Sequence, residues 1–335
     1  YVKAGLYYLR FRGINVILNI TSRDFLLPNS RRMVSLWLGE SIQVEAEHFQ
    51  YLGRIKNVAF LTGFKLDNQS IDAYNNFKLN GAYKQNYSQA YLNFQNSGNN
   101  KIAAGIGTAF EYIRYSPSIN AFSEVKGRFT NFKSYLYLKY NTLNQIFYPT
   151  KGLKISTELA QVYNQKPKIK QYENGVLIEP STLNFDNFAR FTFDGSLFAE
   201  LNKRFTFFSE LQAGLNFTNK PNVLNNFQIG GINGSFRNQI RFAGLQEATI
   251  NSSSVTALQL GLRYNPANNI FILGRINGLV KDFATRNNST SKATFLTGYS
   301  LTFAYKTPIG PLELSAMYSD QSKKIQSYIL FGIPF

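Results

Sequence analysis

Along almost its whole length this chain repeats one pattern, in which every second residue is apolar and the residues between them are polar or small. Successive side chains of a β-strand point to opposite faces, so such a segment predicts a strand with one apolar and one polar face. A clear case runs from Ala293 to Lys306. Its apolar residues are Phe295, Tyr299, Leu301, Phe303 and Tyr305, and its polar or small residues are Thr294, Gly298, Ser300, Thr302 and Lys306.

Sixteen segments follow this pattern, an even number that is typical of single-chain bacterial outer-membrane barrels. They lie at approximately 2–10, 13–24, 31–40, 42–51, 56–66, 79–95, 100–115, 129–141, 152–164, 186–202, 204–217, 254–265, 269–281, 293–306, 311–320 and 324–335.

Alternation alone also fits a soluble β-sandwich, so composition has to choose between the two folds. Charged residues are only 16% of the chain, against about 25% in soluble domains, and aromatic residues are another 16%. No apolar run approaches the roughly 18 residues of a membrane helix. Aromatic rings gather near segment ends, as at Tyr7, Tyr140 and Phe217, where membrane interfaces favour them. We therefore predict an all-β protein, a single 16-stranded antiparallel transmembrane β-barrel over residues 1–335, in the bacterial outer membrane.

The connections between the segments differ in length, as expected for a barrel with short turns at one end and long loops at the other. The short ones include Arg12-Gly13, Asn202-Lys203 and Pro308-Ile309-Gly310, and the long ones include 165–185, 218–253 and 282–292.

The long connection before the twelfth strand, residues 218–253, has the composition of a loop that folds inward. Gly230 and Gly231 allow tight backbone packing, and Arg237 and Arg241 supply cations. A cation in a narrow lumen needs a carboxylate partner, because a buried unpaired charge is strongly unfavourable. The candidate partners on expected inward faces are Asp194, Glu210 and Glu313.

At the end of the chain, Ile329, Phe331, Ile333 and Phe335 alternate up to the last residue. This resembles the C-terminal targeting signal that the barrel assembly machinery recognises, although an ordinary edge strand would look the same. Pro334 lacks an N–H group, which weakens pairing where the last strand meets the first.

Catalytic and metal-binding chemistry finds little support. There is no Cys and only one His, and the alternation places Glu45 and Glu47 on the face opposite His48. We expect no metal, no cofactor and no enzymatic activity in this chain. The formal charge of +17 predicts attraction to anions.

The basic residues are too scattered to indicate nucleic-acid binding. We expect some of the charge on loops near lipopolysaccharide and some in the lumen, where it would favour anions. The expected lumen cations include Lys133, Lys139, Lys154, Arg263 and Arg275.

Four motifs together resemble the superfamily of BamA, TamA and the two-partner-secretion transporters, the bacterial surface antigen family of sixteen-stranded outer-membrane barrels. The resemblance covers essentially the whole chain. Its motifs are Leu-Asn-Ile-Thr-Ser-Arg-Asp-Phe-Leu at 18–26, Tyr-Pro-Thr-Lys-Gly at 148–152, Gly230-Gly231 followed by Phe236-Arg237, and Thr-Pro-Ile-Gly-Pro-Leu at 307–312.

Within that superfamily, residues 227–231 and 240–245 look most like barrels that follow a patatin-like phospholipase domain in proteins of the Bacteroidetes type. The resemblance implies a patatin-like domain and a POTRA module upstream. Neither lies within this sequence, and the Gly-x-Ser-x-Gly elbow of a patatin is absent from it. Because Tyr1 begins directly in a strand pattern, we expect the chain to be a piece of a longer polypeptide.

Two departures from the family pattern concern the inward loop. The family carries Val-Arg-Gly and an aromatic residue there, whereas Phe236-Arg237-Asn238 matches only the arginine. Arg237 is therefore the first candidate for the loop arginine and Arg241 the second. The acidic residue expected in the thirteenth strand, around 275–278, is also missing.

The function that these features favour is anchoring, and beyond that export, of an upstream patatin-like domain. In this hypothesis the first and last strands form a seam that opens sideways, and the inward loop plugs the lumen. An assembly insertase and a passive pore that leans towards anions are the alternatives. The expected partners are outer-membrane lipid and lipopolysaccharide, the barrel assembly machinery and the upstream domain, with homodimer formation left open.

Overall fold

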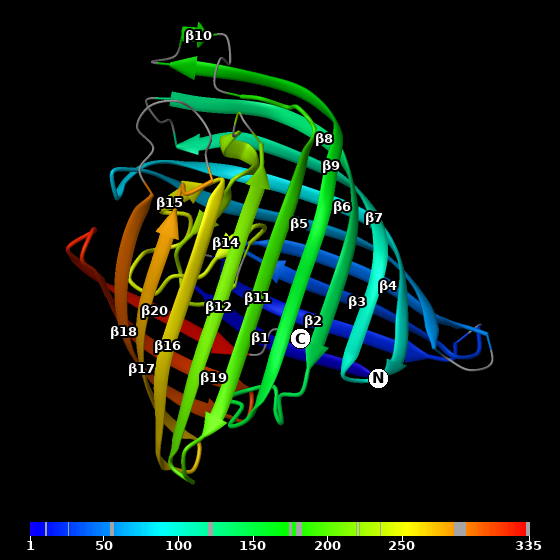
Figure 1. Ribbon diagram of the computed structural model, residues 1–335, viewed down its shortest axis with the longest axis vertical. Coiled ribbons are helices and arrows are strands. Elements are labelled where there is room, and N and C mark those ends of the chain that lie inside the picture. The colour runs from blue at the N-terminus through cyan, green and yellow to red at the C-terminus, as the bar shows by residue number, and fades with distance from the viewer. Residues whose placement is uncertain are drawn as a thin grey trace.

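The computed structural model shows a closed antiparallel β-barrel of sixteen wall strands (Figure 1). Each wall strand pairs with the next, and the last pairs with the first. No helix in the described part of the chain has the length and apolarity needed to cross a membrane. The structure describes residues 1–10, 12–25, 27–53, 57–119, 123–173, 176–178, 183–218, 220, 222–234, 236–284 and 293–332.

Each of the sixteen expected segments corresponds to one wall strand, although the strands at 58–75, 123–141 and 152–173 extend six to nine residues beyond the segments expected there. The wall strands are β1 (Val2–Leu9), β2 (Gly13–Arg23), β3 (Ser30–Gly39), β4 (Ile42–Leu52), β5 (Val58–Asn75), β6 (Lys78–Asn99), β7 (Ile102–Ile119), β8 (Ser123–Asn141), β9 (Gly152–Glu173), β11 (Phe188–Glu200), β12 (Phe205–Phe217), β16 (Ser254–Ala267), β17 (Ile270–Lys281), β18 (Thr294–Thr307), β19 (Gly310–Ser319) and β20 (Lys324–Gly332).

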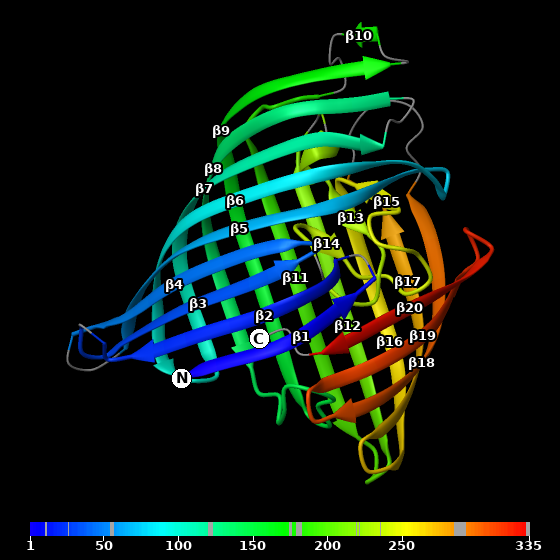
Figure 2. The same ribbon diagram turned by 180° about the vertical axis from the view of Figure 1, so that it is seen from behind.

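The predicted loop at 165–185 is wrong in its first half, because β9 continues to Glu173. There it pairs with the first residues of β8, and the short β10 (Val176–Ile178) turns back onto it. Figures 1 and 2 show β5 to β9 as the long strands of the barrel, reaching past the others at one end.

The strand order assigns every connection to one of the two barrel ends. We call the end that holds 218–253 the loop end, and the end that holds both chain termini and the connection 201–204 the turn end. Connections between wall strands alternate between the two ends. The connection between β1 and β2 is at the same end as 218–253, so the short turn before Gly13 lies with the long loops. The expected separation of short turns from long loops therefore fails at this first hairpin.

The two faces of the wall follow the predicted alternation. On β2, Ile14 and Val16 are 59% and 50% exposed on the outer face, whereas Asn15 and Asn19 are buried on the inner face. The outer surface is thus apolar and the inner surface largely polar, as a barrel in lipid requires. Apolar inner residues such as Ile17 are covered by the long connection 218–253, so the packed core lies inside the barrel.

Candidate functional site: the inner loop

The connection 218–253 is here called the inner loop, and its described residues fold back into the barrel as the sequence predicted. The loop contains a 3-10 turn, η1 (Val223–Asn225), and a small sheet of three strands that Figure 2 shows enclosed by the wall. Its apolar side chains pack on inward residues of β16, β17 and β18, including Val255, Leu279 and Leu296. The three short strands are β13 (Phe227–Ile229), β14 (Gln239–Ile240) and β15 (Ile250–Ser252).

Glycines make this compact arrangement possible. Gly230 has a φ of +133°, and a Cβ atom there would lie 1.8 Å from the carbonyl oxygen of Gln246. Gly298 on β18 plays the same part on the wall, since its Cβ would lie 1.9 Å from the carbonyl oxygen of Ala243. The main chain of the inner loop therefore rests directly on the main chain of the wall.

Arg241 binds the wall at β11 and β12. Its Nη2 lies 3.0 Å from Oδ2 of Asp194 and 3.2 Å from Oε2 of Glu210. Two of the three expected carboxylates therefore bind Arg241, the second candidate for the loop arginine, and not Arg237. Gln212 tightens the contact by accepting from the backbone N–H of Arg241 at 2.7 Å and donating to Asp194 at 2.6 Å. Burial alone would lower the pKa of Arg241, but the two carboxylates outweigh it and raise that pKa.

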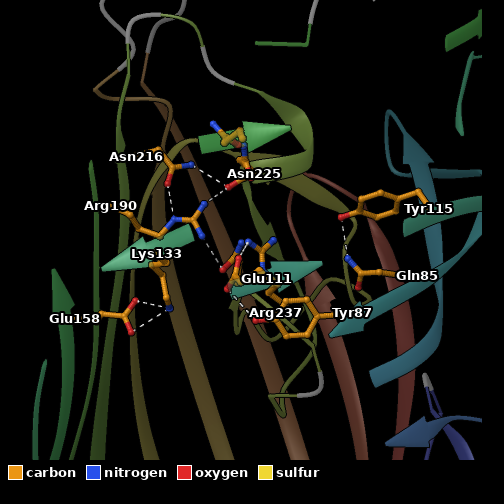
Figure 3. A network of polar contacts seen from close by, with 12 residues as sticks. Gln85, Tyr87, Glu111, Tyr115, Lys133, Glu158, Arg190, Asn216, Asn225 and Arg237 are labelled. Carbon is orange, nitrogen blue, oxygen red and sulfur yellow. Dashed lines mark hydrogen bonds and ion pairs between the residues drawn. The ribbon is translucent and has the colours of Figure 1, made fainter. Parts of the chain in front are cut away.

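Arg237 binds a carboxylate that the sequence reasoning missed. Its Nη2 donates to Oε2 of Glu111 on β7 at 3.0 Å, and the hydroxyl of Tyr87 donates to Oε1 of the same carboxylate at 2.9 Å (Figure 3). The guanidinium also lies over the Tyr87 ring, 5.4 Å from its centroid. Glu111 was detectable in principle, because it is the inward carboxylate between Ala109 and Ile113 in a predicted strand.

Glu313, the third expected partner, binds neither arginine. It accepts a hydrogen bond from the hydroxyl of Tyr148 at 2.8 Å, in the connection between β8 and β9. Tyr148 belongs to the Tyr-Pro-Thr-Lys-Gly motif, and Arg263 donates to the carbonyl of Pro149 at 2.9 Å. That motif thus fastens the turn end of the wall.

Strand β17 is the predicted thirteenth strand, which lacks the expected acidic residue, and uncharged side chains hold the arginine on it. Arg275 on β17 donates to the hydroxyl of Thr302 at 2.6 Å and lies over the ring of Phe208. A similar solution holds Arg190 of β11, which is buried and donates to Asn216, to the backbone carbonyl of Asn225 and to Asn238 (Figure 3).

Part of the lumen remains open beside the inner loop. A cavity of about 570 Å³ lies against Arg190 and Arg237, and Lys133 lines it while pairing with Glu158 at 3.0 Å. Of the other expected lumen cations, Arg263 is buried on the inner face. Lys139 and Lys154 also alternate onto the inner face, in step with Lys133 on β8 and Glu158 on β9, and both are exposed.

The seam between β1 and β20 is short. In the described residues it pairs only Tyr7–Leu9 with Leu330–Gly332, while β1 pairs with β2 along all of Val2–Leu9. Gly332 has a φ of +98°, and a Cβ atom there would lie 1.8 Å from the carbonyl oxygen of Leu6. Side chains of the inner loop, including Ile232, pack against the inner side of this seam.

The expected C-terminal signal is only partly visible. Ile329 is 39% exposed on the outer face and Phe331 is half-buried. Ile333, Pro334 and Phe335 lie outside the described residues. No group of three His, Asp or Glu side chains that could hold a metal ion occurs in the described ranges.

Comparison with known proteins identifies the family. The model of the OMP85 superfamily matches residues 1–335. BamA from Haemophilus ducreyi, in a structure lacking POTRA domains 1–3, is similar with a TM-score of 0.69 at 12% identity, over 98% of this chain and 69% of that one. CdiB from Escherichia coli gives a TM-score of 0.63 at 9% identity, over 98% of this chain and 62% of that one.

CdiB from Acinetobacter baumannii is also similar, with a TM-score of 0.56 at 12% identity, over 98% of this chain and 58% of that one. The chain thus spans 58% to 69% of these proteins. No curated protein sequence matches it. The chain itself resembles the barrels of transporters and insertases of this superfamily, which are not enzymes. This chain belongs to the OMP85 superfamily, and it is an integral β-barrel of the outer membrane.

Proposed function

We propose that this barrel anchors an upstream domain of its own polypeptide in the outer membrane and exports that domain, with the β1–β20 seam opening during export. The observation that carries the proposal is the short seam. It pairs over three residues on each side in the described part of the chain, whereas β19 and β20 pair over eight. Fewer backbone hydrogen bonds make it the easiest place for the wall to part.

A patatin-like upstream domain is the second part of the proposal. Its support is the sequence resemblance at 227–231 and 240–245, which includes the glycines that compact the inner loop. The expected upstream POTRA module, and contact of the barrel with lipopolysaccharide, belong to the same proposal.

Two other functions use the same geometry differently. An insertase for other barrels would use the seam as a template for incoming strands. A passive pore would conduct ions steadily. The inner loop argues against this function, because it occupies the lumen and is bound by ion pairs at β7 and at β11–β12.

A disulfide across the seam tests the proposal. Tyr8 and Phe331 lie directly opposite each other, and the sequence has no native Cys, so Tyr8→Cys combined with Phe331→Cys gives one defined cross-link. In the full-length protein we expect oxidation to abolish protease accessibility of the upstream domain on intact cells, and reduction to restore it. Leu314→Cys with Ile329→Cys, a matched pair between β19 and β20, is expected to have no effect.

The outcomes separate the alternatives. Unchanged surface exposure with a fully cross-linked seam contradicts export through the seam. If the same cross-link instead reduces the folded amount of other outer-membrane barrels, the insertase function is favoured.

A further inference from the structure

The outer face of β6 to β9 carries a dense group of basic side chains at the loop end. All of them are exposed, and within the described residues none forms an ion pair with a carboxylate. We call this group the basic patch. It consists of Lys84, Arg114, Lys126, Arg128, Lys166, Lys168 and Lys170.

The strand register sets these cations side by side. Arg114 of β7 lies opposite Arg128 of β8, which lies opposite Lys168 of β9. Lys126 lies opposite Lys170 in a further row. Neighbouring strands are about 4.8 Å apart, and like charges placed directly opposite each other are destabilising. Such rows are explained most simply by an anionic partner that neutralises them.

The basic side chains cannot relieve this repulsion by turning inward. The inner face of the same strands is filled by a packed cluster that includes Phe129 and Ile113, both fully buried, with Ile169 against it. Glu124 is the one carboxylate on the outer face of these β8–β9 rows in the described residues, and it is half-buried opposite Tyr172. The patch is therefore held outward with a large excess of positive charge.

An apolar groove lies on the same strands, nearer the middle of the barrel. It has a volume of about 640 Å³, and its small residues include Thr108, Ser134 and Ala189. Large apolar side chains border it, among them Phe94 and Leu136. Because these side chains face the membrane, the groove opens to the hydrocarbon of the bilayer.

Aromatic rings separate the groove from the basic patch. Phe110 and Phe132 lie opposite each other with their centroids 5.2 Å apart, and Tyr163 stacks on Phe132 at 6.1 Å. From Thr108 to Arg114 the strand rises roughly 20 Å, at about 3.3 Å per residue. Along one face the order is therefore apolar groove, aromatic row and basic patch, which is the order of acyl chain, interface and headgroup in a lipid.

We propose that this face binds a phosphorylated lipid of the outer leaflet, with an acyl chain in the groove and headgroup phosphates against the Arg114–Arg128–Lys168 row. Arginine and lysine are the natural partners of phosphate oxygens. Lipopolysaccharide belongs to this chemical class. This inference deepens the proposed contact with lipopolysaccharide by assigning it a site; it rests on that contact and on the position of the barrel in the outer membrane, and not on export, so lipid binding and export can fail separately.

Native mass spectrometry of the detergent-solubilised barrel with diphosphorylated lipid A tests the site. We expect Arg114→Gln, Arg128→Gln and Lys168→Gln together to weaken binding about 100-fold, since each basic residue near an anionic surface contributes about a factor of five. A matched control removes three exposed cations at the turn end, Lys151→Gln, Lys203→Gln and Arg204→Gln, and is expected to bind normally.

A second variant examines the groove without changing charge. Ser134→Trp fills it and is expected to weaken lipid A binding, whereas Ala316→Trp on the outer face of β19 is not. Retained heat-dependent migration on gels checks that each barrel is folded. Normal lipid binding by the triple Gln variant overturns the proposal. Full displacement of lipid A by inorganic phosphate, with no effect of Ser134→Trp, shows a phosphate site only and overturns the lipid assignment.

Discussion

Arg237 and Glu111 form a buried ion pair between residues 126 positions apart in the sequence, with 3.0 Å between Nη2 and Oε2. The pair joins the inner loop to β7. The Tyr87 hydroxyl binds the other carboxylate oxygen, so both oxygens of Glu111 are satisfied.

We expect Arg237→Leu to destabilise the folded barrel by about 3–5 kcal/mol, because it leaves the Glu111 carboxylate buried without its cation. The double variant Arg237→Leu with Glu111→Leu is expected to recover most of that loss, since it removes both charges. Urea unfolding of the refolded barrel in detergent measures the change. Equal losses for the single and double variants would show that the pair contributes packing and no electrostatic compensation.

The contact between Gly298 and Ala243 makes a second prediction. A Cβ atom at position 298 would come 1.9 Å from the backbone carbonyl oxygen of Ala243, which cannot move as a side chain would. We expect Gly298→Ala to cost about 1–3 kcal/mol, as overpacking usually does, and to increase protease cleavage within the inner loop. Gly274→Ala on the neighbouring β17 has no atom within 4 Å of the new Cβ and is the matched control.

The agreement between sequence and fold has a physical cause. The period of two is a local property of each strand, and one wrong step would turn every apolar side chain of that strand into the lumen. The sequence therefore predicted the bounds of strands with a regularly apolar outer face, such as β2 and β18, to within one residue. The same test missed the far half of β9, where the outer face carries Lys166, Lys168 and Lys170 and is not apolar.

The inner loop was less predictable for a related reason. Its inward folding follows from its length, glycines and arginines, but the choice of partners depends on a three-dimensional path that no local pattern encodes. Asp194 and Glu210 were identified because they lie on inward faces, yet they bind Arg241 and not Arg237. Glu111 satisfied the same criterion and was missed among many inward residues.

The ion pairs of the inner loop predict the conductance of the barrel. Arg241 binds Asp194 at 3.0 Å and Arg237 binds Glu111 at 3.0 Å, so the loop is fastened at two separate sectors of the wall. We expect the wild-type barrel to be nearly silent in planar bilayers and Arg237→Ala with Arg241→Ala to conduct, with preference for anions. Arg204→Ala, an exposed cation at the turn end, is expected to stay silent. Steady conductance of the wild-type barrel would instead favour the passive pore.

Glu247 gives the inner loop a dependence on pH. Its side chain is 4% exposed, and its Oε1 has no hydrogen-bond partner in the described structure. Burial raises the pKa of this carboxyl above its ordinary value. A carboxyl whose pKa is raised by folding opposes folding when it ionises. That penalty is absent below about pH 4, where the group is protonated in both states, grows as the pH rises, and is complete above the raised pKa.

We therefore expect Glu247→Gln to match the wild type in stability in acid and to exceed it at neutral and alkaline pH. Urea unfolding midpoints in detergent, measured across this range, give the comparison. Glu200→Gln removes an exposed carboxylate at the end of β11 and serves as the control for loss of one negative charge. If Glu247→Gln becomes less stable than the wild type as the pH rises, the ionised Glu247 carboxylate has a favourable partner in the barrel, and the assigned penalty is wrong.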